Sequence, residues 1–238
     1  MSRPVALVVV APGTNRNRDV ADALELAGAQ PHTALISDVV DRPRLLEDVH
    51  MIVVPGGFSH ADSLGAGRVF ALTLALRLGD RLRAFVDSGR PVIGICNGFQ
   101  TLVRAGLLPG ALGHNASGRF QCEWVTLDPQ PGRCIWTRGL DPFDCPIAHG
   151  EGRYVHSDVV ALDAAGQVAL RYRVDPNGSA GAVAGVCDET GLVLGLMPHP
   201  ENHVVARQHP QHRRGAAGGS GVHLFERGVQ HVREVAAC

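Results

Sequence analysis

The segment from residue 91 to residue 106 constrains the fold more than any other part of the chain. Its apolar run Val92–Ile95 predicts a short buried strand, and Asn97–Arg104 predicts a helix that ends at Gly106. A single residue, Cys96, joins the two, with a glycine two positions away on either side. A strand that turns this sharply into a helix is typical of α/β proteins whose junction residue is a nucleophile.

Cys96 has the surroundings expected of a reactive thiol. The positive end of the following helix favours the thiolate form, and Gln100 lies one helical turn further on the same face. The alternative interpretation is a small buried residue at a strand end, because free cysteine also packs as a hydrophobic side chain. A nucleophile at this position needs a base, an orienting group and an oxyanion hole from elsewhere in the chain.

Strands and helices alternate through the first half of the chain, which predicts a parallel sheet with right-handed crossovers. Binding sites in such sheets form at the carboxyl ends of the strands, where unusual glycine, asparagine, serine and cysteine residues stand in this chain. The expected strands are 5–10, 33–36, 51–54 and 92–95, and the expected helical segments are 18–27, 43–48, 69–88 and 97–104.

After Gly110 the pattern changes to short apolar segments between turn signals such as Asp175-Pro176-Asn177-Gly178. We expect an antiparallel extension of the same sheet. The fold class is then α/β, a flavodoxin-like mixed, mainly parallel sheet flanked by helices, in a single domain over residues 1–238. Residues 215–221 predict a flexible loop and 222–236 a closing helix. The expected strands of this half are 120–127, 134–137, 154–160, 168–174, 182–186 and 192–196.

Composition and charge narrow the function. Hydrophobic residues at 45% and charged residues at 19% describe an ordinary globular core, and a formal net charge of −1 argues against a nucleic-acid or membrane-surface role. No apolar run has the length of a membrane span, no signal peptide precedes the first strand, and the six cysteines lack C-x-x-C pairs. We therefore expect a cytoplasmic protein without a zinc site or disulfide framework.

The candidate base lies in the segment 198–201, Pro-His-Pro-Glu, which follows the last expected strand. His199 is placed to deprotonate Cys96 and later to protonate a leaving amine, while Glu201 is placed to fix the orientation of the imidazole. The alternative is two exposed polar residues in a proline-rich loop. The histidines from His199 to His223 also allow a metal site, but their loose spacing disfavours it.

The candidate oxyanion hole follows the third expected strand. Backbone amides at Gly56 and Gly57 approach a substrate without side-chain obstruction, and the amide of Asn97 follows the nucleophile directly. The alternative is a plain glycine turn, which is common after strands.

Taken in order, three motifs resemble the class I (triad) glutamine amidotransferases: Gly-Gly-Phe-Ser at 56–59, Gly-Ile-Cys-Asn-Gly-Phe-Gln at 94–100 and Pro-His-Pro-Glu at 198–201. The chain is most similar to one branch of that family, the glutaminase subunits of phosphoribosylformylglycinamidine synthase (subunit I), over almost its whole length. The closer resemblance is carried by 13–15, 55–59, Asp62, 66–67, 96–100, 106–110, Asn115, Phe120, Trp124, 148–153, 176–179 and 198–201.

The resemblance implies the class I amidotransferase fold and a catalytic triad of Cys96, His199 and Glu201. It implies that the thiolate attacks the side-chain amide of glutamine, that ammonia leaves from a γ-glutamyl thioester, and that water then releases glutamate. His149 and Glu151 are candidates for shaping the glutamine pocket or the ammonia exit, or for a structural role. The implied glutamine and oxyanion site consists of Gly56, Gly57, Asn97 and Gln100.

The resemblance also implies partners. Ammonia goes to a synthetase, which uses ATP and magnesium to convert formylglycinamide ribonucleotide to formylglycinamidine ribonucleotide in purine biosynthesis, and a small third subunit is a further candidate partner. This chain contains no G-x-x-x-x-G-K-[ST] loop, so no cofactor is expected in it. The segment 56–67 and the residues after Glu201 are the expected docking surfaces. The family usually has Tyr-Gly at 60–61 and arginine at 65 and 202, where this chain has His60-Ala61, Gly65 and Asn202.

Three alternatives share parts of the pattern. A glutaminase subunit of another amidotransferase has the same three motifs and differs only in the finer ones. A DJ-1/PfpI-like thiol hydrolase has the same cysteine elbow, but the distant Pro-His-Pro-Glu segment and Gly-Gly-Phe-Ser disfavour it. A non-catalytic regulatory subunit is disfavoured because Cys96, His199 and Glu201 are all present.

Overall fold

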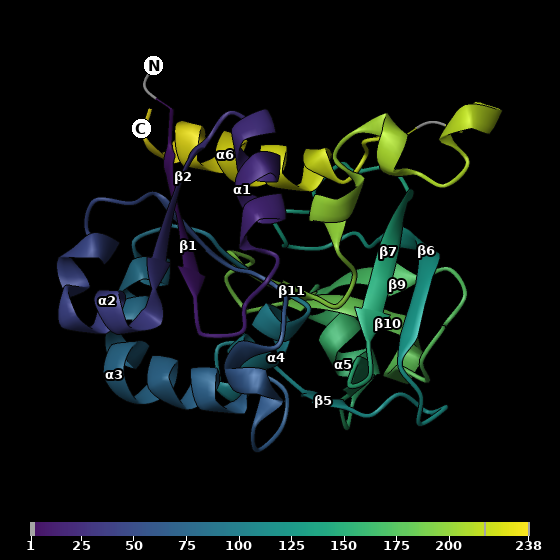
Figure 1. The fold of residues 1–238 in the computed structure, drawn as a ribbon, viewed down its shortest axis with the longest axis horizontal. Coiled ribbons are helices and arrows are strands. Elements are labelled where there is room, and N and C mark those ends of the chain that lie inside the picture. The colour runs from purple at the N-terminus through teal and green to yellow at the C-terminus, as the bar shows by residue number, and fades with distance from the viewer. Residues whose placement is uncertain (1–2, 217, 238) are drawn as a thin grey trace.

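The computed structural model describes residues 3–216 and 218–237, so one position of the glycine-rich segment 215–221 lies outside the described residues. A nine-stranded sheet in the order β2-β1-β3-β4-β11-β10-β9-β6-β7 forms the centre of the molecule, and β5 and β8 form a separate antiparallel pair (Figure 1). The strands are β1 (Val5–Val10), β2 (Gln30–Leu35), β3 (Met51–Val54), β4 (Val92–Ile95), β5 (Ala111–Gly113), β6 (Gln121–Pro129), β7 (Phe143–His149), β8 (Arg153–Val155), β9 (Val168–Tyr172), β10 (Val183–Cys187) and β11 (Val193–Leu196).

The sheet has a parallel half and an antiparallel half. Strands β2, β1, β3, β4 and β11 pair in parallel, and β10, β9, β6 and β7 continue the sheet through antiparallel pairs. Within the described strands of this sheet, only β10 and β6 therefore run against the common direction. The carboxyl ends of β1, β3, β4, β11, β9 and β7 consequently meet at one edge, which confirms the mixed, mainly parallel α/β fold class with its antiparallel extension.

Helices cover both faces of the parallel half (Figure 1). Helices α1 and α6 contact each other on one face, and α3 contacts both α2 and α4 on the other. No helix in the described ranges has the length and apolar character needed to cross a membrane. The helices are α1 (Asn17–Leu26), α2 (Ile36–Asp41), α3 (Arg68–Asp87), α4 (Asn97–Arg104), α5 (Val159–Ala164) and α6 (Val222–Val235).

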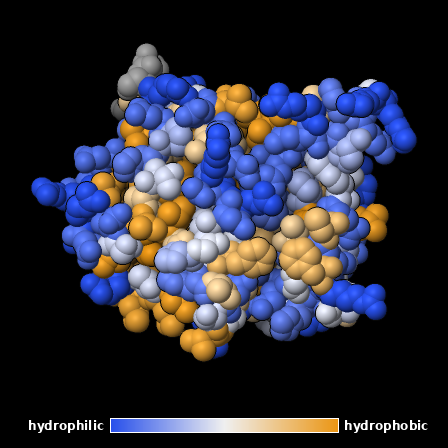
Figure 2. Space-filling model, viewed as in Figure 1, coloured by the Kyte–Doolittle hydropathy of each residue, from blue (hydrophilic) through white to orange (hydrophobic). Residues whose placement is uncertain are grey.

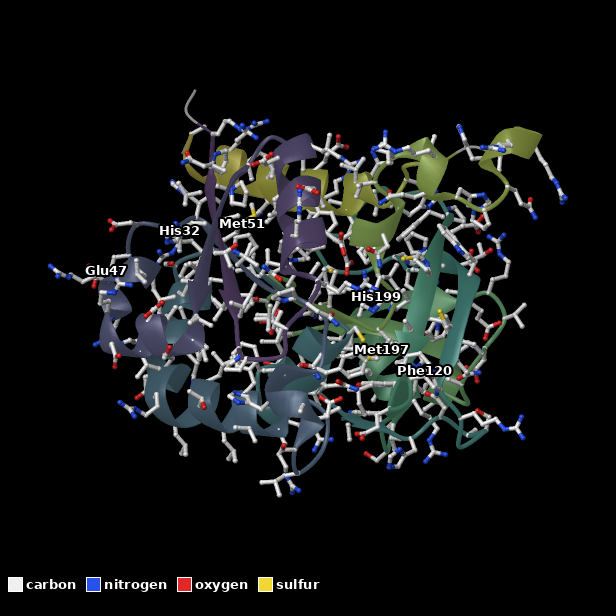
Figure 3. The ribbon with its side chains drawn as sticks, viewed as in Figure 1. His32, Glu47, Met51, Phe120, Met197 and His199 are labelled. Carbon is white, nitrogen blue, oxygen red and sulfur yellow. The ribbon has the colours of Figure 1, made fainter. Side chains whose placement is uncertain are left out.

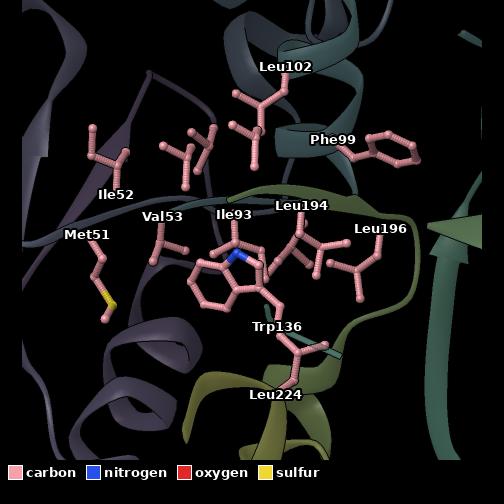
Figure 4. Packing of buried hydrophobic residues seen from close by; sticks show 14 of the residues in the cluster. Met51, Ile52, Val53, Ile93, Phe99, Leu102, Trp136, Leu194, Leu196 and Leu224 are labelled. Atoms are coloured by element: carbon pink, nitrogen blue, oxygen red, sulfur yellow. The ribbon is translucent and has the colours of Figure 1, made fainter. Parts of the chain in front are cut away.

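The core explains the continuous apolar runs of the central strands. Phe99 and Leu102 of α4 lie on one side of Ile93 in β4, and Trp136 and Leu224 lie on the other (Figure 4). A strand covered on both faces has no solvent-facing side, so it reads as an unbroken apolar segment rather than an alternating one. Three such strands of the first half, at 5–10, 51–54 and 92–95, match the sequence prediction to the residue, and so does the helix at 97–104.

The structure differs from the sequence prediction for the first half at three segments. The second strand begins at Gln30 rather than at residue 33, because it is the sheet edge and its first residues are mostly exposed and polar. Helix α2 was not predicted, since it is only six residues long and buries just Ile36 and Val39. The helical turn expected at 43–48 is a 3-10 segment, Pro43–Leu46.

The prediction of a strand at 134–137 is wrong. These residues form a buried turn in which the indole of Trp136 donates a hydrogen bond to the carbonyl of Leu192 at 2.9 Å. A Cβ at Gly228 of α6 would lie 2.2 Å from the Trp136 ring, so the helix backbone packs directly on the indole. The apolar run marks a segment that fills the space under α6, and not a strand.

The prediction of a strand at 154–160 is also wrong in its second part. Strand β8 ends at Val155, and α5 begins at Val159 after Asp158, whose carboxylate accepts a hydrogen bond from the Ala161 amide at 2.8 Å. Strand β7 was missed altogether, and it contains Pro146. A proline is tolerated there because β7 is an edge strand of the sheet.

Candidate active site

Cys96 occupies a strained turn between β4 and α4. Its φ of 51° and ψ of −105° lie in a region that residues other than glycine rarely adopt, and its side chain is buried. The Cys96 amide donates to the carbonyl of Leu196 at the end of β11 (2.8 Å). A Cβ at Gly98 would lie 1.9 Å from the carbonyl oxygen of Val54, so only glycine lets α4 approach β3 this closely. The thiol is thereby held at the edge where the strands end.

His199 and Glu201 form a buried pair just beyond β11. The His199 Nδ1 atom lies 2.7 Å from Oε1 of Glu201, and both residues are nearly inaccessible to solvent. The His199 amide donates to the carbonyl of Pro146 in β7 at 2.9 Å, which ties the loop to the far edge of the sheet. Figure 3 shows His199 in the middle of the molecule beside β7. With Nδ1 bonded to the carboxylate, Nε2 is the nitrogen left for proton transfer.

Gly56 brings the imidazole and the thiol together. A Cβ on this residue would lie 2.7 Å from Cε1 of His199 and 3.4 Å from Cβ of Cys96, so its backbone passes against both side chains. Burial lowers the pKa of His199, but the Glu201 carboxylate and then the Cys96 thiolate outweigh it and raise that pKa to about 10. The arrangement therefore favours a protonated imidazole of His199 beside Cys96.

Asn97 fastens the loop after β3 to the nucleophile turn. Its buried side-chain oxygen accepts from the amide (3.3 Å) and hydroxyl (2.5 Å) of Ser59, and its nitrogen donates to Asp62 (3.1 Å) and to Gln100 (3.0 Å). Sequence reasoning assigned only the backbone amide of Asn97 and missed this network. Among the described residues the amide of Gly57 donates to no backbone or side-chain acceptor, and it stays available to a substrate.

The segment that follows the glycine pair is strained. His60, Ala61 and Asp62, in the 3-10 segment Ser59–Asp62, have φ values of 53°, 54° and 51°, and Leu64 has 66°. Such left-handed residues cost about 1–3 kcal/mol each unless the surroundings fix them. Ala61 stands where the family usually has glycine, so the chain tolerates a conformation here that glycine adopts more easily.

A pocket of about 210 Å³ opens beside Cys96, with its entrance flanked by half-exposed Phe58 and Phe120. Figure 2 shows a light-orange group of side chains where Figure 3 places Phe120. A larger cleft of about 680 Å³ lies toward the opposite edge of the sheet, near Val193, but none of the described cysteines lines it. The thiol of Cys96, and not the volume, therefore identifies the smaller pocket as the candidate active site.

One side of the pocket is acidic. Burial, and next the charge of Glu151, raise the pKa of Asp62, so the two carboxyl groups lie close enough to repel each other. Glu151 also pairs with Arg104 at 3.5 Å. Gln100 lines the pocket, but its side chain accepts from Asn97 and donates to the carbonyl of Glu151 at 2.7 Å, which leaves one N–H for a ligand. Within the ranges 3–216 and 218–237, no three His, Cys, Asp or Glu residues are grouped as a metal site.

The elbow, the His–Glu pair and the mixed sheet together form a candidate thiol site. Residues 3–232 match the family model of the CobB/CobQ-like glutamine amidotransferase domain, and the chain belongs to this family.

Within the family, the chain is similar to proteins named phosphoribosylformylglycinamidine synthase subunit PurQ. It is 41% identical to the Treponema denticola protein, over 97% of this chain and 99% of that one, and 42% identical to the Thermotoga maritima protein, over 85% and 89%. The solved structure of PurLQS from Thermotoga maritima contains a chain with a TM-score of 0.80 and 38% identity, over 96% of this chain and 98% of that one. A glutamine amidotransferase of Thermotoga maritima, at 15% identity and a TM-score of 0.54 over 87% of this chain and 80% of that one, shares the fold.

Proposed function

We propose that this chain is the glutaminase subunit of a phosphoribosylformylglycinamidine synthase. It hydrolyses glutamine to glutamate and supplies ammonia to a synthetase subunit, which converts formylglycinamide ribonucleotide to formylglycinamidine ribonucleotide in purine biosynthesis. The observation that carries the proposal is the buried His199–Glu201 pair, which Gly56 brings against the thiol of Cys96. The relatives named PurQ, which match almost the full chain, support the choice of synthetase.

In the first half of the reaction, the Cys96 thiolate attacks the side-chain carbonyl carbon of glutamine. The backbone amides of Gly57 and Asn97 donate hydrogen bonds to the oxyanion that forms. Nε2 of His199 gives its proton to the nitrogen, the C–N bond breaks with its electron pair on nitrogen, and ammonia leaves. A γ-glutamyl thioester on Cys96 is the product of this half-reaction.

In the second half, Nε2 of His199 takes a proton from water as the water oxygen attacks the thioester carbon. The tetrahedral intermediate collapses, the C–S bond breaks, and glutamate leaves with the Cys96 thiolate restored. Glu201 keeps the imidazole in one orientation throughout and stabilises its protonated form. Both half-reactions therefore use the same base and the same carboxylate.

The pocket suits one small amino acid. Its volume of about 210 Å³ is below the range of drug-sized ligand sites, and its acidic side fits the α-ammonium group of glutamine. We assign that ammonium group to the carboxylates of Asp62 and Glu151, and one amide contact to the free N–H of Gln100. Opposite charges attract, so the acidic side favours the bound zwitterion over a neutral amide.

The partner docks at the pocket entrance. The strained loop 60–64 and the half-exposed Phe58 and Phe120 border this opening, so a synthetase seated there receives ammonia without its release to water. ATP and magnesium act in that partner, and a small third subunit is a further component. We place the assembly in the cytoplasm, since the five described cysteines are unpaired, and treat residues 1–238 as one amidotransferase domain because strands from both halves form one sheet.

The test combines the purified chain with its synthetase, formylglycinamide ribonucleotide, ATP and magnesium, and measures glutamate and formylglycinamidine ribonucleotide. One glutamate per amidine product is expected with glutamine as nitrogen source. Absence of glutamate formation with and without the synthetase refutes the glutaminase assignment. Glutamate formation that no formylglycinamide ribonucleotide synthetase stimulates, but another amidotransferase synthetase does, assigns the chain to that other pathway.

A further inference from the structure

His149 lines the catalytic pocket but has no part in the mechanism above. It is the last residue of β7, its side chain is 3% exposed, and the carbonyl oxygen of the preceding residue, Ala148, lies 3.9 Å from Sγ of Cys96. The carboxyl end of β7 therefore lies against the nucleophile, on the side contributed by the antiparallel half of the sheet.

The hydrogen bonds of Asn115 fix which nitrogen of His149 carries the hydrogen. Its side-chain nitrogen donates to two carbonyl oxygens, those of Arg119 and His149, each at 2.9 Å. The other atom of the carboxamide is thus the oxygen, which accepts from the amide of Gly152 at 3.1 Å. It also lies 3.1 Å from Nδ1 of His149, and an oxygen there requires a hydrogen on Nδ1.

Nε2 of His149 is consequently a lone-pair acceptor in a neutral ring. It is buried and has no hydrogen-bond partner within the described part of the chain. Burial, and next the positive charge of His199, lower the pKa of His149 to about 4, so the nitrogen stays unprotonated at neutral pH. A buried acceptor without a partner is unfavourable, so a ligand that donates to it recovers free energy.

We propose that Nε2 of His149 and the carbonyl oxygen of Ala148 together form the acceptor site for the carboxamide nitrogen of glutamine. The inference rests on the proposed glutaminase function and assigns the reacting group of that substrate to two protein atoms. A carboxamide presents two N–H donors to such a site. The carboxylate of glutamate presents only lone pairs, so the same site repels the product.

The Ala148 carbonyl oxygen lies at a distance from the thiol that is right for this role. Attack requires the carbonyl carbon within about 3–3.5 Å of the sulfur, and the leaving nitrogen is one bond from that carbon. An acceptor 3.9 Å from Sγ is therefore within reach of the bound substrate's N–H. As His199 transfers its proton to this nitrogen, positive charge grows there and the fixed lone pairs stabilise it more strongly than in the ground state. His149 itself takes up no proton.

A substrate comparison separates this role from a structural one. In the assembled enzyme, His149→Phe is assayed with glutamine and with glutamate γ-methyl ester, which has a methoxy group in place of the amide nitrogen and no hydrogen to donate. We expect kcat/KM to fall roughly 10–100-fold for glutamine and less than about 3-fold for the ester. The variant His149→Gln, which keeps a side-chain oxygen as acceptor, should recover part of the loss with glutamine. Equal losses for both substrates overturn the proposal.

The controls distinguish the possible failures. His114→Phe replaces an exposed histidine that also lines the pocket, and both substrates should respond to it alike. If the unmodified enzyme hydrolyses neither substrate, the glutaminase function itself fails. If it hydrolyses both and His149→Phe leaves their ratio unchanged, only the acceptor site fails.

A second measurement avoids substitution at His149. In the full chain carrying Cys96→Ala and ¹⁵N-labelled histidine, Nε2 of His149 should give the resonance of an unprotonated ring nitrogen and shift when glutamine is added. Added glutamate should leave it in place. A protonated Nε2 in the free protein, or an identical response to both ligands, overturns the assignment.

Discussion

The two halves of the sheet reach the same pocket by different means. In the parallel half, the reacting groups are placed by close backbone packing: Gly98 lies against the carbonyl of Val54, and Gly56 lies against both Cys96 and His199. In the antiparallel half, the end of β7 is placed by buried polar side chains. The His199 amide, which donates to the carbonyl of Pro146, joins the two halves at 2.9 Å.

The polar half depends on a connected network. Asn177 donates to the carbonyl of Gly152 at 2.9 Å, its oxygen accepts from the hydroxyl of Ser179 at 2.6 Å, and that hydroxyl accepts from the amide of Tyr154 at 3.0 Å. Together with Asn115, these groups hold the segment 149–154 that borders the pocket. The difference teaches that close backbone packing at glycine adds to the Asn97 network and the His199–Glu201 pair in the parallel half, whereas the end of β7 depends on buried hydrogen bonds, which respond to single polar substitutions.

The largest expected effect comes from substitution of Cys96, at the centre of the parallel half. Replacement of Cys96 by serine removes the thiolate that forms the thioester, so glutamine-dependent synthesis in the assembled enzyme should fall by at least about 10⁴-fold. Ammonia-dependent synthesis by the partner should survive, because it bypasses this chain. The measurement is amidine product formed from glutamine and from ammonium salt in parallel. Near-normal use of glutamine by the serine variant contradicts the nucleophile assignment.

The next effect separates the base from its orienting group. Loss of the His199 imidazole in His199→Ala removes proton transfer from both half-reactions, which is worth roughly 10²–10⁴-fold per step. The Glu201→Ala variant keeps a misoriented imidazole and should retain more activity. Steady-state glutamate release by both variants in the assembled enzyme makes the comparison. Small and equal effects of the two substitutions argue against the triad.

The same difference between the two halves of the sheet determined which features could be predicted from the sequence. Strand 92–95 and helix 97–104 were predicted to the residue, because an apolar run bounded by glycine is a local signal. The sequence also singled out Cys96, His199 and Glu201, which the structure brings to one edge of the sheet, while their catalytic roles stay predictions. The apolar segment Cys134–Thr137 was wrongly predicted as a strand, because a buried turn and a strand have the same apolar composition.

Some site residues reach the pocket only through the way the antiparallel half folds, and local sequence patterns could not predict them. Ala148 reaches the thiol only because β7 runs in the common direction, and that direction follows from the reversals at β10 and β6. The side chain of Asn97 was missed because its partners, Ser59 and Asp62, lie on a different segment of the chain. Long-range pairings of this kind leave no periodic pattern in the sequence.

A smaller effect concerns the loop after β3. We expect the free chain to hydrolyse glutamine slowly, with an oxyanion hole that the synthetase completes through the glycine-rich, strained segment 56–64. Docking of the partner with its nucleotide substrate should raise kcat by about 10²-fold, the value of one oxyanion donor, with little change in KM. Glutamate release with and without the loaded synthetase measures it. Full-speed hydrolysis by the chain alone refutes the idea that the synthetase completes the oxyanion hole, and it leaves the triad assignment intact.

The pH dependence of stability tests the polar half. The folded-state pKa of His149, about 4, lies below its ordinary value of 6.5, so the unfolded chain binds a proton in that interval and the folded chain does not. The contribution is complete above pH 6.5 and is lost as the pH falls toward 4, a change of about 2–3 kcal/mol in the free energy of unfolding.

Urea unfolding of the free chain under reducing conditions at several pH values in that interval, compared with His149→Gln, measures this contribution as a difference of slopes. His114→Gln serves as the matched control at an exposed position and should keep the wild-type slope. Other buried histidines such as His203 titrate in both proteins and cancel. Parallel slopes for wild type and His149→Gln would show that the ring is not held neutral by its surroundings.

The smallest effect concerns Ala61, at φ 54° in the strained loop of the parallel half. A left-handed alanine costs about 1–2 kcal/mol, and Ala61→Gly removes that cost, while the added freedom of the unfolded chain takes back about 0.4–1 kcal/mol. The net expectation is a stabilisation of about 0.5–1 kcal/mol in urea unfolding. Ala84→Gly, in the exposed face of α3, should have the opposite sign because glycine weakens a helix interior. Destabilisation by both substitutions would mean that the loop does not hold Ala61 in the left-handed conformation.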